Sequence, residues 1–221
     1  MLSQFKATVP FNCAIFTRNA RMNYLAHIYL SEDQEMIRIG NFMADHIKGS
    51  KYKVYPTEVQ KGILLHRKID WFTDLDETAR KSKRRLHDRY GLYRGIIIDI
   101  FYDHFLAANF SEYSEMALND YASVFYSSLQ ANEELLPEQV RHMTEYMIRN
   151  DWLTSYAETV GISQVLVGMN RRTGGRGKMD MAIEDLREHY DDFELDFRHF
   201  FKKLRTLSSQ NLQELHEHFS Q

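Results

Sequence analysis

Residues 93–110 read YRGIIIDIFYDHFLAANF and are apolar on every side of a helix drawn through them. A helix that is hydrophobic all round lies inside a protein, whereas a surface helix carries one apolar stripe. We therefore predict a central buried helix over this stretch. Two acids, Asp99 and Asp103, interrupt it four positions apart.

These two carboxylates share one face of the predicted helix. Like charges at this spacing destabilise even an exposed helix by about 0.2–0.5 kcal/mol. Buried carboxylates destabilise a fold far more unless a cation pairs with them. The cation could be an Arg or Lys from a neighbouring helix. It could also be a divalent metal, because carboxylate oxygens are hard ligands.

A second pair with the same spacing is His66 and Asp70, which continue an apolar helical face. Two helices therefore offer pairs of metal ligands, and this co-occurrence favours a metal site over two separate ion pairs. Histidine with carboxylate suits Mn, Fe or Zn.

Three further residues are candidate ligands: His27, Asp45 and His104. Each also has a structural interpretation. A lone histidine on an apolar face is usually a hydrogen-bonded core residue, and Asp45 could pair with Lys48. The role of each imidazole and carboxylate stays open at this point.

Helical periodicity runs through most of the remaining chain, without internal repeats or alternating strands. A helix opens at Pro56, where Thr57 and Gln60 have the spacing of a capping box. The other predicted helices cover residues 31–49, 77–90, 119–131, 137–150, 151–160, 162–172 and 179–207. The predicted fold class is all-α, in a single domain.

The composition of the 221 residues is globular, with 43% hydrophobic and 27% charged residues. One cysteine, Cys13, excludes an intramolecular disulfide framework and favours a reducing compartment, so we expect a cytoplasmic protein. No apolar run reaches the roughly 18 residues of a membrane span. We interpret residues 1–21 as a non-native or upstream-start extension, 22–207 as the domain and 208–221 as a C-terminal tail.

The net charge of −3 argues against nucleic acid as a partner, but the charges are segregated. Seven basic residues and the single acid Asp88 lie between Arg80 and Arg94. A second basic loop comprises Arg171, Arg172, Arg176 and Lys178. Each run alone is typical of a solvated surface, but two of them in one acidic protein indicate an acidic partner.

Several common site patterns are not met. Residues 173–178, TGGRGK, lack the spacing of a phosphate loop and join predicted helices. No Glu-x-x-His occurs, which argues against a ferritin-like di-iron centre.

Short motifs in a fixed order resemble the acyl carrier protein phosphodiesterase family over residues 22–207. They are MNYLAH at 22–27, GNFMAD at 40–45, HRKID at 66–70 with Thr73-Asp74, DIFYDHFL at 99–106, Trp152-Leu153 with Tyr156, Gly168-Met169 and Arg171-Arg172.

The resemblance implies a single-domain helical bundle of the HD-type metal phosphohydrolases. It implies hydrolysis of holo acyl carrier protein to apo-protein and 4'-phosphopantetheine, with a divalent metal that we expect to be Mn, or else Mg, Fe or Co. The metal ligands would be His27, Asp45, His66, Asp70, Asp99 and Asp103. The further catalytic candidates are His104, Asp74, Arg171 and Arg172, and the expected docking residues are Lys83, Arg84, Arg85 and Arg89.

Two other functions remain open on the sequence. An HD-type nucleotide phosphohydrolase would use the same metal ligands but would need a pocket that stacks a base. A non-catalytic helical scaffold would instead pair Asp99 and Asp103 with cations.

Overall fold

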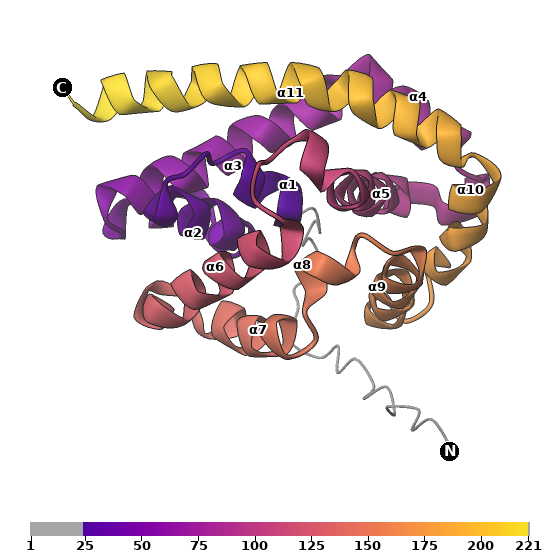
Figure 1. Cartoon of the computed structure of the whole chain (residues 1–221), viewed down its shortest axis with the longest axis horizontal. Helices are drawn as coiled ribbons and strands as arrows, with labels where there is room; N and C mark the ends of the chain where they lie inside the picture. Colours follow the sequence, from indigo (N-terminus) through magenta and orange to yellow (C-terminus); the bar gives the residue numbers. More distant parts are fainter. Residues whose placement is uncertain (1–23, 221) are drawn as a thin grey trace.

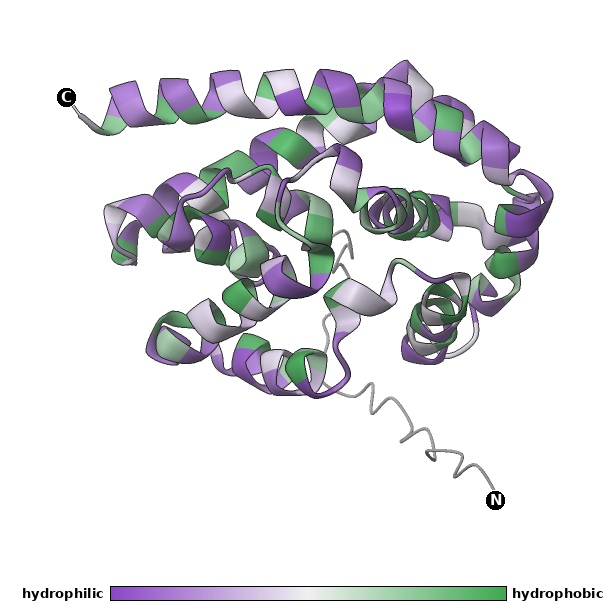
Figure 2. Cartoon of the chain, viewed as in Figure 1, coloured by the Kyte–Doolittle hydropathy of each residue, from purple (hydrophilic) through white to green (hydrophobic). Residues whose placement is uncertain are grey.

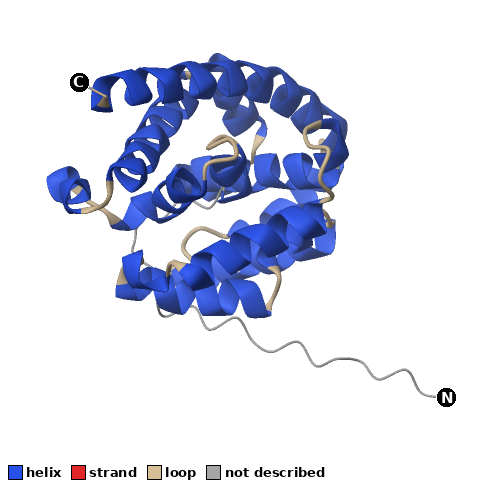
Figure 3. Cartoon of the chain, turned by 60° about the vertical axis from the view of Figure 1, so that its left-hand side comes forward, coloured by secondary structure: helices blue, strands red, loops and turns tan. Residues whose placement is uncertain are grey.

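The computed structural model describes residues 24–220, and all regular elements in this range are helices (Figure 3). The predicted all-α class is confirmed. The α-helices are α1 (Tyr24–Tyr29), α2 (Glu35–Met43), α3 (Thr57–Leu75), α4 (Glu77–Arg85), α5 (Arg94–Ala108), α6 (Leu118–Ala131), α7 (Glu138–Arg149), α8 (Trp152–Ser155), α9 (Thr159–Arg172), α10 (Ala182–Glu188) and α11 (Tyr190–Phe219). Short 3₁₀ helices are η1 (Ala44–His46), η2 (Gly49–Val54), η3 (Asp88–Tyr93), η4 (Phe110–Glu112), η5 (Glu133–Leu135) and η6 (Met179–Met181). The extension predicted at residues 1–21 lies outside the described residues.

The predicted buried helix is confirmed as α5. Its side chains from Ile97 to Ala107 are all buried, including the two aspartates. Helices α1, α4, α9 and α11 contact it, and Figure 1 shows α11 passing across one side of the molecule above α3 and α5. In Figure 2 α5 is largely hydrophobic, whereas α11 carries both hydrophobic and hydrophilic residues along its length. The all-round apolar pattern thus marks the centre of the core.

Four predicted helices are shorter or interrupted in the structure. The helix predicted over residues 31–49 is α-helical only in α2, before η1, and the helix predicted over 151–160 is reduced to α8. The basic helix predicted over residues 77–90 ends at Arg85, because Leu86 adopts an extended backbone (φ −67°, ψ 144°) and is buried. The helix predicted over 179–207 is divided at His189 (φ −121°, ψ 30°) into α10 and α11. At Leu86, burial of an apolar side chain outweighs helical continuity.

The segment predicted as a tail after residue 207 is the last part of α11, which runs to Phe219. Leu212 and Leu215 are buried there. Lys61 of α3, only 6% exposed, places its Nζ 2.9 Å from Nδ1 of His216. The sequence pattern underestimated this helix because only a narrow stripe of it is apolar.

The predicted capping box of α3 does not form. The N-cap is Pro56, one residue before Thr57, and no side chain caps the helix. Gln60 Nε2 instead donates to the Tyr55 carbonyl at 2.8 Å.

Helices α2 and α3 approach so closely that two glycines are required at their contact. A Cβ at Gly40 would lie 2.2 Å from the Val59 carbonyl oxygen, and one at Gly62 would lie 2.2 Å from the Ile37 carbonyl oxygen. Both positions are therefore restricted to a residue without a side chain. The contact brings Asn41, next to Gly40, against the middle of α3.

We predict that Gly62→Ala lowers the free energy of unfolding by about 1–3 kcal/mol, because the added methyl group forces the backbones of α2 and α3 apart. Thermal unfolding measures the effect. Gly95→Ala in α5 is the matched control, since its Cβ would meet only the Lys83 side chain at 3.8 Å. Equal stability of the two variants would contradict the close contact.

A buried carboxylate joins α4 to α11. Asp196 is 1% exposed, and its oxygens accept from Arg85 Nη1 at 2.5 Å, Lys81 Nζ at 2.9 Å and Ser82 Oγ at 3.0 Å. Burial alone would raise the pKa of Asp196, but Arg85, Lys81 and Ser82 lower it below its usual value. Two cations of the basic run are thus part of the fold.

Because the folded-state pKa of Asp196 is lower than in the unfolded chain, this network stabilises the fold above about pH 4 and is lost as pH falls through the folded value. We expect Asp196→Asn to lower the unfolding free energy at neutral pH by about 3 kcal/mol and to make stability less dependent on pH in acid. Chemical denaturation between pH 3 and 7 measures both. Glu77→Gln, which alters an exposed pair with Arg84, is the control; an unchanged acid profile in Asp196→Asn would contradict the assignment.

None of the helices in the described part of the chain combines the length and hydrophobicity that crossing a bilayer requires.

Candidate metal centre

The core of the candidate site is one face of α3. His66 and Asp70 are one helical turn apart, and His66 Nε2 lies 3.4 Å from Asp70 Oδ2. The His66 side chain is 7% exposed and that of Asp70 is 22% exposed. The predicted pairing of these two residues on one face is therefore present, at a depth where few water molecules reach it.

Helix α1 contributes His27 to the same place. Its ring stacks on that of His66 with centroids 4.1 Å apart and an interplanar angle of 23°. His27 Nε2 lies 3.5 Å from Asp70 Oδ1. Each oxygen of the Asp70 carboxylate thus faces the Nε2 of a different imidazole.

Asp45, in η1, completes the arrangement, with Oδ1 3.5 Å from His66 Nε2. Ligand atoms of His27, His66 and Asp70 all lie within 4.8 Å of one another, the one such group of three or more found in residues 24–220. Ligands about 2.1 Å from a tetrahedral metal are about 3.4 Å apart. The observed separations therefore fit a shared divalent cation.

The remaining ring nitrogens of both histidines meet Asn41, which is completely buried. Asn41 Oδ1 is 2.7 Å from His27 Nδ1 and 3.1 Å from His66 Nδ1. In residues 24–220 both Nε2 atoms are buried and make no hydrogen bond. A donor set of two imidazole nitrogens and carboxylate oxygens is suited to a divalent metal.

Electrostatics in this group are dominated by burial and mutual charge. Burial lowers the pKa of His27, and the nearby His66 lowers it further. Burial would also lower the pKa of His66, but the carboxylates of Asp45 and Asp70 raise it to about 9. Burial would raise the pKa of Asp70, yet His27 and His66 lower it. The carboxylates of Asp45 and Asp70 thus keep a positive charge on the His66 ring beside them.

Asp99 and Asp103 are buried in α5, as predicted. Neither belongs to the metal-ligand group found in the described residues. Asp103 accepts hydrogen bonds from the backbone N–H of Leu25 at 3.0 Å and of Ala26 at 2.8 Å. It thereby satisfies two donors at the start of α1, which carries His27. Burial and the charge of Asp99 raise the pKa of Asp103 well above its usual value, although these backbone bonds oppose the shift.

His104, also on α5, has a partner for each ring nitrogen. Nδ1 lies 2.8 Å from the Tyr156 carbonyl and Nε2 lies 2.9 Å from the Tyr190 hydroxyl. Burial lowers the pKa of His104. The neutral ring can donate from Nδ1 and accept at Nε2, which satisfies both contacts.

Asp74 lies one further helical turn along the face of α3 that carries His66 and Asp70. Its Oδ1 is 3.5 Å from Lys83 Nζ, and its carbonyl accepts from Arg80 Nε at 3.2 Å. The first part of the basic run therefore meets the C-terminal end of α3, the helix that carries His66 and Asp70.

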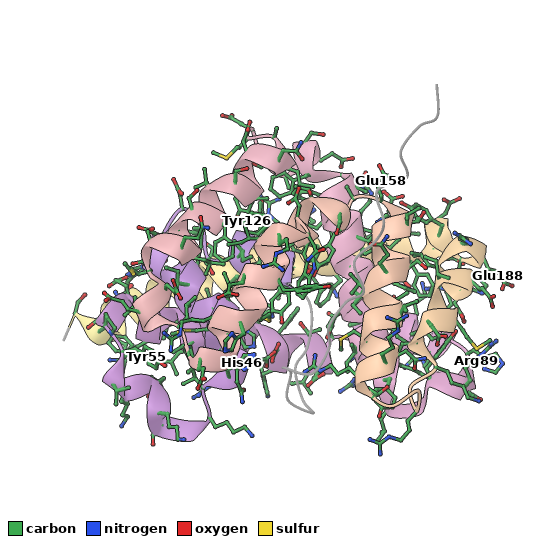
Figure 4. The ribbon with its side chains drawn as sticks, turned by 90° about the horizontal axis from the view of Figure 1, so that it is seen from below. His46, Tyr55, Arg89, Tyr126, Glu158 and Glu188 are labelled. Carbon is green, nitrogen blue, oxygen red and sulfur yellow. The ribbon has the colours of Figure 1, made fainter. Side chains whose placement is uncertain are left out.

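Arg171 and Arg172 end helix α9. Arg172 Nη1 lies 3.6 Å from the sulfur of Met169 on the same helix. Burial raises the pKa of Tyr24 and lowers that of His46, and the charge of Arg172 contributes a smaller lowering of both. His46 is visible in Figure 4.

The four expected docking residues differ in exposure. Arg84 is exposed and pairs with Glu77, whereas Arg85 is mostly buried, with Nη1 on Asp196 and its guanidinium over the Phe193 ring. Arg89 lies over the Tyr90 ring and is seen in Figure 4 at the end of the molecule away from Tyr55.

Together, the helical fold and the group of His27, His66 and Asp70 define an all-α protein with a site suited to a divalent metal. The family model described as acyl carrier protein phosphodiesterase matches residues 22–204. The chain therefore belongs to the acyl carrier protein phosphodiesterase family, and it is a hydrolase of phosphoric diesters.

Curated relatives with this name cover most of the chain. The protein from Pectobacterium atrosepticum is 28% identical over 188 residues, which are 85% of this chain and 97% of the relative. That from Photorhabdus laumondii is 30% identical over 184 residues, 81% of this chain and 91% of the relative. No solved structure matches the chain.

Sequence reasoning named every member of the metal-ligand group but did not single out Asn41. The residue was inside a quoted motif, yet an asparagine in a helix has no distinctive spacing signal. Its position became informative only once α2 was placed against α3.

We predict opposite phenotypes for substitutions of Asp70 and Asp103. Asp70→Ala should weaken Mn²⁺ binding by more than about tenfold, since it removes two oxygens of the group. Asp103→Ala should instead lower the unfolding free energy by roughly 2–4 kcal/mol, because two buried backbone N–H groups lose their acceptor. Isothermal titration and chemical denaturation of both variants test this; loss of Mn²⁺ binding without loss of stability in Asp103→Ala would make Asp103 a ligand.

Proposed function

We propose that this protein hydrolyses the phosphodiester that joins 4'-phosphopantetheine to the serine of holo acyl carrier protein. Water adds to phosphorus, the bond from phosphorus to the serine oxygen breaks, and the serine oxygen takes up a proton. The products are apo carrier protein and 4'-phosphopantetheine. Family membership over residues 22–204 carries the proposal, and the buried His and Asp group supports it.

We propose Mn²⁺ as the resident ion, with Mg²⁺, Fe²⁺ or Co²⁺ as alternatives. His27, His66, Asp70 and Asp45 are the residues that would bind it. A divalent cation supplies Lewis-acid activation of water and neutralises charge on the phosphoryl oxygens. The relation to HD-type phosphohydrolases, the assignment of Asp99 and Asp103 as ligands and the catalytic roles of Asp74 and His104 stay predictions.

Phosphate recognition is assigned in this proposal to the end of α9. A guanidinium can bind two phosphate oxygens at once in a planar fork. Arg172 is the stronger candidate, because it is partly buried at the end of α9. Arg171 is exposed one position earlier.

The carrier protein would dock on the basic residues next to the end of α3. Lys83 contacts Asp74, which lies on the His66 and Asp70 face of that helix. Arg84 is exposed beside it. Arg85 is less suited to docking because its pairing with the buried Asp196 would break, so the surface to test is Lys83 with Arg84, and Arg89 farther along.

The activity is tested by mass spectrometry of holo carrier protein incubated with this protein. We expect loss of the 4'-phosphopantetheine mass with Mn²⁺ present, and no loss after treatment with EDTA. Release of phosphate from nucleotides, with holo carrier protein unchanged, would favour a nucleotide phosphohydrolase instead. No reaction with either substrate, from protein that binds Mn²⁺, would contradict the proposed function.

Docking is tested by charge reversal. Lys83→Glu with Arg84→Glu should raise KM for holo carrier protein roughly tenfold or more at low salt, because electrostatic steering of an acidic partner is lost. The effect should shrink near physiological salt, where the screening length is about 8 Å.

Arg141→Glu with Arg149→Glu on α7 makes the same net charge change at another surface and serves as the control. Hydrolysis of a small phosphodiester should be the same in both double variants. An equal rise in KM in the control would mean that overall charge, rather than this surface, governs the encounter.

A further inference from the structure

One side-chain oxygen contacts both imidazoles of the metal centre. Asn41 Oδ1 lies 2.7 Å from His27 Nδ1 and 3.1 Å from His66 Nδ1. This is feasible because the two rings are stacked, with centroids 4.1 Å apart, and a carbonyl oxygen has two lone pairs. Both lone pairs are therefore used within the protein, which leaves Asn41 without an oxygen for direct metal ligation.

The orientation of the Asn41 amide is set by its nitrogen. Nδ2 donates to the His27 carbonyl and to Ser31 Oγ, each at 2.9 Å. Ser31 Oγ in turn donates to the same His27 carbonyl at 2.9 Å. A flipped amide would point its N–H groups at the two ring nitrogens and its oxygen at the His27 carbonyl oxygen, so the bond to that carbonyl would be lost.

The oxygen therefore faces the rings, and as an acceptor it requires a proton on Nδ1 of each. A neutral imidazole with a proton on Nδ1 has its lone pair on Nε2. The Nε2 atoms are those that lie 3.4–3.5 Å from the Asp70 oxygens. When both rings are neutral, the two hydrogen bonds thus present both lone pairs on the side where the carboxylates converge.

We propose that Asn41 is a positioning residue that sets the tautomer and the orientation of both metal-binding imidazoles through a single carbonyl oxygen. The role in metal binding rests on the proposed function, whereas the hydrogen bonds from both rings to Asn41 do not depend on it. Without Asn41, the acceptors near the rings would be the carboxylates of Asp70 and Asp45. A proton drawn to Nε2 by these carboxylates would occupy the atom that a metal needs.

The first test is independent of metal and of activity. Two-bond ¹H–¹⁵N spectra of metal-free protein with labelled histidine report which ring nitrogen carries the proton. We expect the wild-type protein to show His27 as the neutral Nδ1–H tautomer and His66 with Nδ1 protonated. In Asn41→Leu, which has a similar volume and no acceptor, we expect His27 to shift toward the Nε2–H tautomer.

The second test is Mn²⁺ affinity measured by isothermal titration. Asn41→Leu should weaken binding by about 10–100-fold, the range found when groups that orient metal ligands are removed. Asn41→Asp keeps an oxygen that can accept from both rings and should restore most of the affinity. Ser31→Ala is the matched control, because it removes a partner of Nδ2 while leaving Oδ1 in place, and it should change the affinity by less than about threefold.

Several results would overturn the proposal. One is a wild-type spectrum in which His27 carries its proton on Nε2; this result needs no variant to fold. Another is folded Asn41→Leu protein with wild-type tautomer and wild-type affinity. A third is equal loss of affinity in Asn41→Asp and Asn41→Leu, which would assign Asn41 a role in packing alone.

Failure of the proposed function is a separate result. Protein that binds Mn²⁺ with the expected Asn41 dependence but leaves holo carrier protein intact would refute the substrate and preserve this inference. Hydrolysis of holo carrier protein at the same rate by the wild-type protein and by Asn41→Leu would support the substrate and refute the role of Asn41.

Discussion

The contact between α2 and α3 is the constraint on which the metal centre depends. Gly40 and Gly62 let the two helix backbones touch where any Cβ would overlap a carbonyl oxygen. Only at this distance can Asn41 of α2 reach the ring of His66 on α3. Helix α1 is then placed by Asp103, whose carboxylate accepts its first backbone N–H groups, and this brings His27 onto His66.

The charges of this group make it suited to a bound cation. Two carboxylates, Asp45 and Asp70, face two imidazoles in a largely buried place. In the metal-free protein their field raises the pKa of His66 to about 9, so that a proton supplies part of the positive charge. A divalent ion bound by the same atoms would replace that proton and bring a second charge. The proton and the ion therefore compete for the same electrostatic role.

Much of this arrangement could be predicted from the sequence. The all-round apolar pattern of residues 93–110 located the central helix, and the four-residue spacing located His66 and Asp70 on one face. Spacing alone could not separate that pair from Asp99 and Asp103, which have the same geometry within their helix. The two pairs differ in their tertiary contacts, because the start of α1 lies against Asp103. Local periodicity does not indicate which other helix will contact a given side chain.

The basic run shows a similar limit. Its composition correctly predicted a positively charged segment. The sequence did not distinguish Arg85, which forms an ion pair with the buried Asp196 of α11, from the exposed Arg84. Asn41 was also invisible as a functional residue, because its importance comes from two histidines 14 and 25 positions away. Long-range pairing between helices decides both cases.

The most direct test of the metal centre is paramagnetic broadening of the histidine ring signals during titration with Mn²⁺. The account predicts that signals of His27 and His66 disappear first, at less than one equivalent, while those of His104 and His216 persist longer. Earliest loss of the His104 signals, or uniform broadening of all histidines without saturation, would contradict a metal centre at His27, His66 and Asp70.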